Sequence, residues 1–438
     1  MGEVLSGNPR WVALQVFLKL IDHGRSLDDI FASEWFLALP LAARDQAMSR
    51  ELSIGLSRWY FTLLPLLNQR LQKPLRARDQ DVQIILLLGL YQLLVMETGS
   101  HAAVNESVKL TKLLKKNWAS GLTNAVLRKV VRDGLQWQNV DRVTAYPEWM
   151  QQLMRNDWGD QADQIMTGGN QRPPLTLRID TRQQSRKDYL KELESKQIEA
   201  FEHELISTAV QLKTPLDVTT LPGFDLGIVS VQDAATQIAA GLLMCEPGNR
   251  VLDACAAPGG KSAQLLQQYD DIHLDALDIS EKRLDRVREN LQRIGKSARL
   301  VVGDAALPEH WFDGELYDRV LIDTPCTASG VMRRHPDIKL LRRESDIISL
   351  VNQQRKILDA IWPLLKPGGM MLYSTCSIFK DENEKQVTGF LQDNADAEEI
   401  QLSSANWGTA CVHGRQILPG ESDMDGFYYA LLRKSDPG

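Results

Sequence analysis

Two cysteines each follow an apolar, β-prone run of the chain. Cys326 comes after the run and turn Tyr317–Pro325, and Cys376 comes after Leu372–Thr375. Farther upstream, the Gly-rich segment Asp253–Ser262 follows another apolar run. Because ligands of open α/β sheets bind at the carboxyl ends of the strands, we expect both thiols and one nucleotide-type cofactor to share a cleft. That arrangement suits covalent chemistry on an electrophilic ring.

The elements that must position these groups fall into three regions. Residues 1–140 carry apolar side chains at helical spacing, which predicts a small all-α bundle. Residues 141–230 join an alternating strand signal, Leu175–Asp180, to a helix, which predicts a small α+β domain. Residues 231–438 alternate strands with helices, so we expect a Rossmann-like α/β domain with a parallel sheet covered on both faces. The strands expected there are Arg250–Ala254, His273–Asp278, Arg299–Val302, Asp318–Asp323, Met370–Thr375 and Phe427–Leu432.

The ends of the first three of these strands have residues suited to a cofactor. Gly259 and Gly260 let the backbone approach a ligand closely, and amides at a helix start favour a carboxylate. Asp278 stands about 20 residues later, where an acid commonly holds ribose hydroxyls. Asp304 can accept from an adenine amino group. Either acid alone is more simply an N-cap or turn residue, but three consecutive strand ends favour an adenosyl ligand. The glycine spacing is not GxGxxG, so a dinucleotide is not favoured.

The composition, 43% hydrophobic and 24% charged among 438 residues, is typical of a soluble globular protein. No apolar run is long enough to span a bilayer, and Met1–Leu5 does not begin like a signal peptide, so we expect a cytoplasmic protein without membrane contact. The five cysteines form no CxxC pair and the seven histidines do not cluster with them, so we expect no metal site.

The net charge of −7 conceals a basic N-terminal region. Residues 1–140 contain 17 Lys and Arg against 12 Asp and Glu. A second basic cluster comprises Arg333–His335 with Arg342 and Arg343. Such local clusters can contact phosphates whatever the total charge. For any single cluster, solvation of a helix face is the simpler explanation.

In its motifs the chain resembles the Fmu/Sun/RsmB family, the small-subunit ribosomal RNA cytosine-C5 methyltransferases. The motifs are Cys255-Ala-Ala-Pro-Gly-Gly-Lys261, Asp278, Gly303-Asp304, Asp323-Thr-Pro-Cys326 and Thr375-Cys376-Ser377. The middle region is similar through Asn170–Asp180 and Val231–Asp233, and the N-terminal bundle is similar to a NusB-like domain around His101–Glu106. Thr324 is a departure, because the family usually has Ala there.

The resemblance implies a multidomain protein. Its parts are a NusB-like RNA-binding bundle over 1–140, a small α+β linking or RNA-binding domain over 141–230, and a class I S-adenosyl-L-methionine-dependent methyltransferase domain over 231–438. The implied substrate is 16S rRNA, with the cytosine-967 class as the target. A base inside a duplex cannot offer C6 to a thiol, so the cytosine must be unpaired or flipped out. We expect a monomer.

The resemblance also implies a role for each site residue. Cytosine C5 is a poor nucleophile until a thiolate adds to C6 and raises the electron density at C5. Cys376 is the implied nucleophile, Cys326 assists product release, and Asp323 hydrogen-bonds the N3 and amine edge of cytosine. Lys261 either stabilises charge near the thiol or touches the cofactor. The implied residues for S-adenosyl-L-methionine, and for S-adenosyl-L-homocysteine as product, are Cys255, Ala256, Ala257, Pro258, Gly259, Gly260, Lys261, Asp278, Asp304 and Asp323.

Three alternatives stay open. A cytosine-C5 methyltransferase of another RNA or of DNA uses similar parts, but the DNA class uses the cysteine of the Pro-Cys turn and does not need Cys376. N6-adenine or glutamine methylation requires an Asn/Asp-Pro-Pro-Tyr turn, whereas this chain has Asp323–Cys326. A catalytically dead RNA-binding scaffold is disfavoured because the acids, glycines and thiols are all present.

Overall fold

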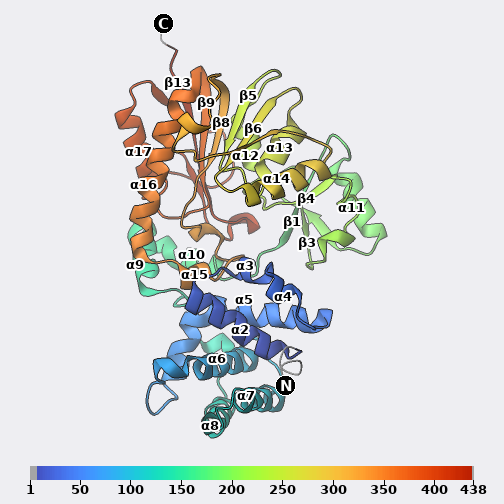
Figure 1. Ribbon diagram of the computed structural model, residues 1–438, viewed down its shortest axis with the longest axis vertical. Helices are drawn as coiled ribbons and strands as arrows, with labels where there is room; N and C mark the ends of the chain where they lie inside the picture. Colours follow the sequence, from blue (N-terminus) through green and yellow to red (C-terminus); the bar gives the residue numbers. More distant parts are fainter. Residues whose placement is uncertain (1–6, 437–438) are drawn as a thin grey trace. The chain divides into compact units, whose positions relative to one another are not determined.

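The computed structural model describes residues 7–436. Met1–Leu5, where we expect no signal peptide, lies outside these described residues. The chain divides into two compact units (Figure 1). The first comprises Met1–Asn170 with Met332–Arg343, and the second comprises Gln171–Val331 with Glu344–Gly438.

The regular elements that the structure describes in the first unit are all helices, joined by turns and loops. Its helices are α2 (Pro9–His23), α3 (Leu27–Phe31), α4 (Glu34–Leu37), α5 (Ala43–Asn68), α6 (Gln80–Leu94), α7 (Ser100–Leu113), α8 (Trp118–Arg132), α9 (Glu148–Trp158), α10 (Ala162–Gly168) and α15 (Ile338–Leu341), with 3-10 turns η1 (Ala77–Asp79), η2 (Trp137–Asn139) and η3 (Gly159–Gln161). Helix α2 starts where the Asn8 side chain accepts from the Arg10 and Trp11 amides, and ends at left-handed Gly24. Helix α6 is almost wholly buried and lies in the centre of one hydrophobic core. The predicted all-α bundle is therefore confirmed.

The segment Met332–Arg343 belongs to the first unit although its neighbours in sequence belong to the second. The amide of Leu27 donates to Asp337 Oδ2 over 2.9 Å, and Lys339 Nζ donates to the carbonyl oxygen of Arg58 over 3.2 Å. Arg333 is fully buried. The expectation that Arg333 provides a surface charge for phosphates is therefore wrong, because its side chain is not exposed to solvent.

The second unit begins with a small antiparallel sheet and one helix. Its strand order is β2-β3-β1-β4, and Leu177 faces Val210 on one side and Val231 on the other. The elements are β1 (Leu175–Ile179), α11 (Arg186–Ser195), β2 (Ala200–Glu202), β3 (Ala209–Leu212) and β4 (Val229–Val231). Apolar side chains of β1, β3 and β4 pack under α11 with Tyr189 and Leu193, and Ala200 of β2 packs against the same cluster. This is the predicted α+β arrangement.

A nine-stranded sheet forms the rest of the second unit, with order β11-β12-β13-β9-β8-β5-β6-β7 and β10 paired to β13. Its strands are β5 (Arg250–Ala254), β6 (His273–Asp278), β7 (Arg299–Val302), β8 (Tyr317–Asp323), β9 (Leu365–Thr375), β10 (Ala397–Ile400), β11 (Thr409–Ala410), β12 (Arg415–Ile417) and β13 (Phe427–Lys434). Its helices are α12 (Ile238–Leu243), α13 (Gly260–Gln268), α14 (Glu281–Arg293), α16 (Glu344–Ile361) and α17 (Glu384–Asp393). The 3-10 turns of the unit are η4 (Val218–Thr220), η5 (Pro308–His310), η6 (Ser329–Val331), η7 (Trp362–Leu364) and η8 (Glu421–Asp423).

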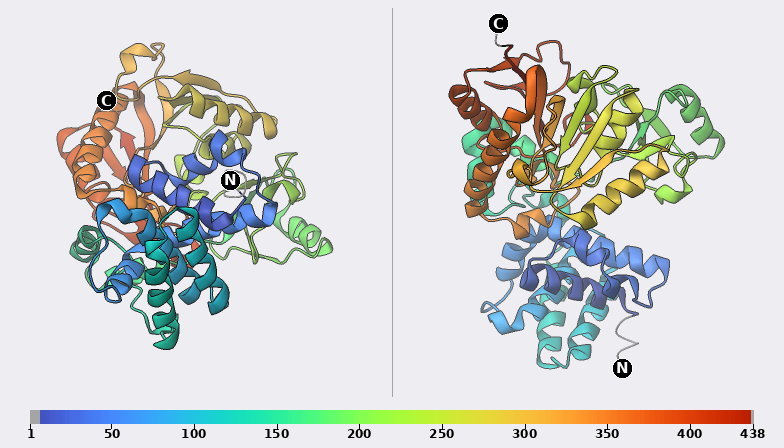
Figure 2. Two further views of the ribbon diagram at one scale, coloured as in Figure 1. Left: turned by 60° about the horizontal axis from the view of Figure 1, so that its bottom comes forward. Right: turned by 45° about the horizontal axis from the view of Figure 1, so that its top comes forward.

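Helices cover both faces of this sheet, as predicted (Figure 1 and Figure 2). Val251 packs on the side of α12, α13 and α14, whereas its neighbour Leu252 packs on the side of α16 and α17. This alternation follows from the two-residue period of a strand, and both residues are apolar because both faces are covered.

The sheet is mixed rather than parallel. Strands β9, β8, β5, β6 and β7 run parallel, but β13 is antiparallel to both β9 and β12. The chain reaches β13 from β12 through a loop without a crossover helix, and such a connection returns antiparallel. Our expectation of a parallel sheet therefore fails for Phe427–Leu432, although a strand does form there.

Candidate active site

Five parallel strands, β5, β6, β7, β8 and β9, place their carboxyl ends at one edge of the larger sheet. Asp253 of β5 stands opposite Leu321 of β8, and Asp323 of β8 stands opposite Ser374 of β9. A cavity of about 220 Å³ opens at this edge. The predicted residues that line it are Cys255, Ala257, Asp278, Asp304, Asp323, Cys326 and Cys376. The convergence of three strand ends and two thiols on one cleft is therefore present.

The remaining predicted residues lie in the loop after β5 or in the first turn of α13, and they do not line the cavity. They are Ala256, Pro258, Gly259, Gly260 and Lys261. Gly259 has φ +95°, and a Cβ there would lie 3.0 Å from the Val287 backbone of α14. Only glycine combines this conformation with this close approach at little cost. The loop thus turns sharply into α13 and leaves Cys255 and Ala257 at the cavity wall.

Asp278, at the end of β6, is fixed before any ligand arrives. Its Oδ2 accepts from the Ala257 amide at 3.2 Å, and its Oδ1 accepts from the Ser280 amide at 3.0 Å. Arg283 lies 3.4 Å from Oδ1. A carboxylate has further lone pairs, so Asp278 can still accept from ribose hydroxyls. Asp304 likewise accepts from the Ala306 amide at 2.9 Å while facing the cavity. These acids and the apolar wall between them fit an adenosyl group.

Lys261 does not line the cavity itself but pairs with Asp323, which does. Its Nζ lies 2.6 Å from Asp323 Oδ2 and 5.2 Å from the centre of the Phe427 ring. The Ser374 hydroxyl donates to the other oxygen of Asp323 at 3.2 Å. Of the two roles left open for Lys261, the geometry favours an electrostatic one through Asp323.

The two strand-end thiols are in contact, with 3.4 Å between Cys326 Sγ and Cys376 Sγ. Cys376 is half-buried, whereas Cys326 is buried. The hydrogen bond with Cys376, followed by burial, raises the pKa of Cys326 well above its usual value. The contact with Cys376 and burial thus favour the neutral form of the Cys326 thiol, and Cys376 is the more exposed of the two sulfurs that line the cavity.

Close backbone packing brings the two thiol-bearing turns together. The Gly330 amide donates to the Cys376 carbonyl oxygen at 2.8 Å, and the Gly426 amide donates to the Gly330 carbonyl oxygen at 2.9 Å. A Cβ on Gly330 would lie 2.2 Å from the Gly426 oxygen. No side chain fits at Gly330 unless the turns separate.

The other three cysteines are not suited to nucleophilic attack. Burial raises the pKa of Cys255 to about 12, with Asp323 and Asp278 adding to the effect. Burial also raises the pKa of Cys245 to about 12 and that of Cys411 to about 11. These thiols stay protonated at neutral pH, and thiolate is the reactive form.

Two buried acids at the site were not singled out from the sequence. Burial raises the pKa of Asp253 to about 7, and its Oδ1 has no hydrogen-bond partner among the described residues. Glu382 is fully buried beside both thiol-bearing turns. The position of Asp253 in the Asp-Ala-Cys motif could have identified it. Nothing local marks Glu382, because its partners lie on separate turns of the chain.

Thr324, where the family usually has Ala, lines the cavity and is buried. Its hydroxyl oxygen has no hydrogen-bond partner in residues 7–436. Its methyl and hydroxyl groups therefore fill wall space without joining the network around the thiols.

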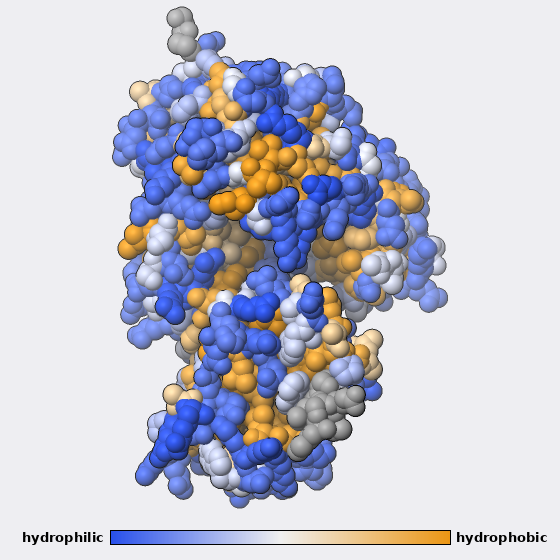
Figure 3. Space-filling view, in the orientation of Figure 1, coloured by the Kyte–Doolittle hydropathy of each residue, from blue (hydrophilic) through white to orange (hydrophobic). Residues whose placement is uncertain are grey.

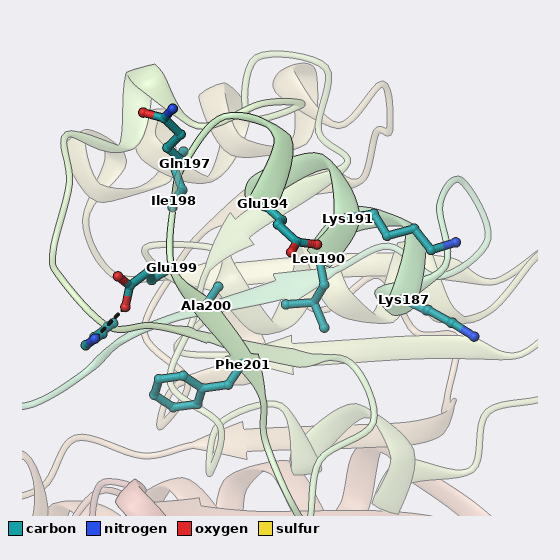
Figure 4. A pocket seen from close by; sticks show the side chains of 10 residues that line it. Lys187, Leu190, Lys191, Glu194, Gln197, Ile198, Glu199, Ala200 and Phe201 are labelled. Atoms are coloured by element: carbon teal, nitrogen blue, oxygen red, sulfur yellow. Dashed lines mark hydrogen bonds and ion pairs between the residues drawn. The ribbon is translucent and has the colours of Figure 1, made fainter.

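A larger cavity, about 720 Å³, lies between α11 and β2 and contains none of the predicted site residues. Figure 4 shows Lys187 and Lys191 on its helical side and Phe201 on its strand side. Glu199 pairs with Lys213 at its rim. Size therefore does not identify the chemical centre here, whereas the clustering of thiols and acids does.

Metal-binding clusters are not found: within residues 7–436, no three His, Cys, Asp or Glu side chains are grouped so that they could hold an ion. Hydrophilic side chains cover much of the face shown in Figure 3. Of the helices that the structure describes, none combines the length and hydropathy needed to cross a membrane.

Comparison with known proteins agrees with this geometry along the chain. Residues 240–433 match the 16S rRNA methyltransferase RsmB/F family, residues 146–219 the RsmF/B-like ferredoxin-like domain, and residues 7–132 the NusB family. The chain is 41% identical to ribosomal RNA small subunit methyltransferase B of Pseudomonas syringae pv. tomato, over 98% of this chain and 97% of that protein.

A second relative, ribosomal RNA small subunit methyltransferase B of Vibrio cholerae, is 42% identical over 98% of each chain. The fold is similar to the crystal structure of PH0851, with a TM-score of 0.79, 23% identity and 99% of both chains covered. The chain therefore belongs to the RsmB/F family of small-subunit ribosomal RNA methyltransferases, which depend on S-adenosyl-L-methionine.

Proposed function

We propose that this enzyme methylates C5 of a cytosine in 16S rRNA through a covalent bond between Cys376 and C6 of the base. One observation carries the proposal. The half-buried Cys376 lines the same cavity as the cofactor acids and lies 3.4 Å from a second thiol. When bound, S-adenosyl-L-methionine supplies an electrophilic methyl group and leaves as S-adenosyl-L-homocysteine.

Each side chain of the site has a separate role in the proposed reaction. Cys376 sulfur adds to C6, which makes C5 nucleophilic enough to take the methyl group. Asp323, oriented by Lys261 and Ser374, hydrogen-bonds the N3 and exocyclic amine edge of the base. A base removes the proton from C5, the electrons of the C5–H bond re-form the C5=C6 double bond, and the Cys376 sulfur leaves as a thiolate. Cys326 assists this release by donating a hydrogen bond from its thiol to the departing sulfur. The short distance between the sulfurs supports this division.

The cofactor is held by the strand-end residues. Asp278 binds the ribose hydroxyls, Asp304 binds the adenine amino group, and the loop from Cys255 to Gly260 surrounds the methionine part. This assignment is supported by the cavity wall and by the preset orientation of Asp278. Cys326 as the nucleophile, the DNA-type alternative, is disfavoured because that thiol is buried and its pKa is raised.

RNA binding is assigned to the NusB-like domain over 1–140 and the α+β domain over 141–230. Exposed basic side chains support it for the first domain: Lys112, Lys115, Arg128, Lys129 and Arg132. Arg128, Arg132 and His101 line a surface groove of about 480 Å³. The resemblance assigns the target to the cytosine-967 class. We expect a cytoplasmic monomer that acts on an unpaired or flipped-out base.

The two thiols can be tested separately. Cys376→Ala is expected to abolish methyl transfer without unfolding the protein. Cys326→Ala is expected to permit attack but slow elimination, so that a protein–RNA adduct accumulates on denaturing gels. Cys411→Ala is the control, because that thiol lies outside the cavity. An adduct in the Cys376 variant would reverse the roles, and 5-methylcytosine mapping in a deletion strain would identify the nucleotide.

A further inference from the structure

A single buried carboxylate joins the two thiol-bearing turns. Glu382 is fully buried. Its Oε1 accepts from the Thr327 amide at 2.8 Å, and its Oε2 accepts from the Thr327 hydroxyl at 2.6 Å and the Ser377 hydroxyl at 2.5 Å. Thr327 directly follows Cys326, and Ser377 directly follows Cys376. The carboxylate therefore bridges positions one residue beyond each sulfur.

Gln354 of α16 extends this link to the other side of Cys326. Its Nε2 donates to Glu382 Oε1 and to the Pro325 carbonyl oxygen, both at 3.0 Å. Pro325 directly precedes Cys326. Both flanks of this cysteine are thus tied to Glu382, on one side directly and on the other through Gln354.

Only a carboxylate can serve all these donors. Each Glu382 oxygen receives two hydrogen bonds, and an ionised carboxylate offers about four acceptor positions and no proton. An amide in its place would turn an NH₂ group toward a donor and leave buried polar groups unpaired. Each unpaired group costs about 1–3 kcal/mol. Burying a charge in this place is itself unfavourable, and the four hydrogen bonds to the carboxylate offset that cost.

Other contacts hold the same turns without Glu382. Ser329 Oγ lies 3.0 Å from Ser377 Oγ and accepts from the Ile378 amide at 3.0 Å. Gly330 donates to the Cys376 carbonyl oxygen at 2.8 Å. The backbones of the turns are therefore anchored independently, and the carboxylate sets the finer placement of the residues beside the sulfurs.

We propose that Glu382 is a positioning residue that sets the separation of the Cys326 and Cys376 sulfurs, and with it the rate at which the enzyme releases methylated RNA. Glu382 is not among the residues that line the cavity and acts through the two turns. The catalytic part of this inference rests on the proposed two-thiol reaction. The positioning part concerns the enzyme without RNA, so it does not depend on that reaction.

Glu384 offers a matched control. It is a largely buried glutamate two residues away that pairs with Lys380 at 3.1 Å and accepts from the Val412 amide at 2.9 Å. None of these partners belongs to a thiol-bearing turn. Glu382→Gln and Glu384→Gln therefore make the same chemical change in similar surroundings, but only the first affects the bridge.

The first measurement uses the full-length enzyme without RNA. Phenylarsine oxide bridges two thiols only when their sulfurs are close, and iodoacetamide then reports by mass spectrometry which cysteines are protected. We expect Glu382→Gln to slow joint protection of Cys326 and Cys376 by about tenfold. Glu384→Gln should match the wild type. If phenylarsine oxide protects the two cysteines of Glu382→Gln at the wild-type rate, the positioning claim is overturned, whatever the reaction mechanism is.

The second measurement follows single turnovers on RNA. Glu382→Gln is expected to slow product release by about tenfold, with adduct accumulating, while KM for RNA and the affinity for S-adenosyl-L-methionine stay within about twofold. Equal losses in both glutamine variants would mean a merely structural role. If Glu382→Gln does not fold, Thr327→Val removes one hydroxyl bond to the carboxylate and should shift both readouts in the same direction by less.

The two proposals fail in different ways. Full activity of Cys376→Ala would refute the covalent reaction and leave the arsenical result standing. Loss of activity in Cys376→Ala, together with wild-type behaviour of Glu382→Gln in both measurements, would refute only the role of Glu382.

Discussion

Lys261 Nζ lies 2.6 Å from Asp323 Oδ2, at the carboxyl end of β8. The Lys261 side chain is 8% exposed and the Asp323 side chain 32% exposed, so the lysine is the more deeply buried partner. The pair joins the loop after β5 to the residue that we assign to the cytosine edge. Each side chain therefore holds the other in place, and neither can be removed without disturbing its partner.

Removing this lysine should impair chemistry more than binding. Lys261→Met leaves Asp323 without its counter-charge, and we expect kcat to fall by about 10²-fold. The double variant that adds Asp323→Asn should have a kcat no lower than that of the less active single variant, because both changes disrupt the same ion pair. Steady-state kinetics of the four proteins provide the measurement. Additive losses would show that the two side chains act independently.

The two thiols should react with alkylating reagents in a fixed order. Cys376 is half-buried and Cys326 is buried with a raised pKa, so iodoacetamide should modify Cys376 first. Modification of Cys326 in the Cys376→Ala variant should require distinctly alkaline pH. Peptide mass spectrometry over a pH series measures both rates, with Cys245 as the buried reference. Faster modification of Cys326 near neutral pH would contradict the assignment.

Asp253 should make stability depend on pH in an unusual direction. Burial raises its pKa in the folded protein to about 7, from an ordinary value of 3.8, so folding favours the neutral carboxyl. The cost of ionising it grows as pH rises from the unfolded pKa to the folded pKa and is constant above that. Asp253→Asn removes this cost, so its Tm relative to the wild type should be higher at pH 8 than at pH 5.

Asp313 serves as a control because its pKa is shifted in the opposite direction to that of Asp253. Arg250, with Arg299 assisting, holds the pKa of Asp313 below its usual range. Its ionised form stabilises the fold above the unfolded pKa, and this stability is lost as pH falls through the folded pKa. Asp313→Asn should therefore lower Tm at pH 7. Differential scanning calorimetry without cofactor compares both variants, and a pH-independent Tm difference for Asp253→Asn would contradict the account.

The basic groove of the NusB-like domain should contribute counterion release to RNA binding. Replacing Arg128 and Arg132 by Ala is expected to weaken binding and to reduce the slope of log K against log salt by about 1–2. Lys366→Ala is the control, because Lys366 lies near the amino end of β9 and pairs with Asp318. Filter binding over a salt series suffices. An unchanged slope in the double variant would exclude this groove from the footprint.

The sequence predicts those parts of the structure that depend on local pattern. Ser280 caps α14, Leu284, Val287 and Leu291 form its buried face, and Gly295 follows its end. Strand ends are equally predictable, because apolar runs stop where polar residues begin. For this reason the sequence alone places Asp278, Cys326 and Cys376 in one cleft.

Features that depend on distant partners could not be predicted. Thr327 and Glu382 are 55 positions apart and meet only because β8 and β9 are neighbours. Met332–Arg343 likewise packs with the helical unit through distant contacts. One is the hydrogen bond from the Leu27 amide to Asp337, 310 positions apart. The direction of β13 depends on a loop path that apolar periodicity does not encode. Division of the chain at residues 140 and 230 stays a prediction.

The most direct test is mass spectrometry of the enzyme trapped on RNA that carries 5-fluorocytidine at the target position. Fluorine at C5 cannot be removed as a proton, so the sulfur–C6 bond should persist after methyl transfer. We predict a nucleotide attached to the peptide containing Cys376, and no adduct in Cys376→Ala. Attachment to the Cys326 peptide, or methylated RNA formed at the wild-type rate by Cys376→Ala, would contradict the account.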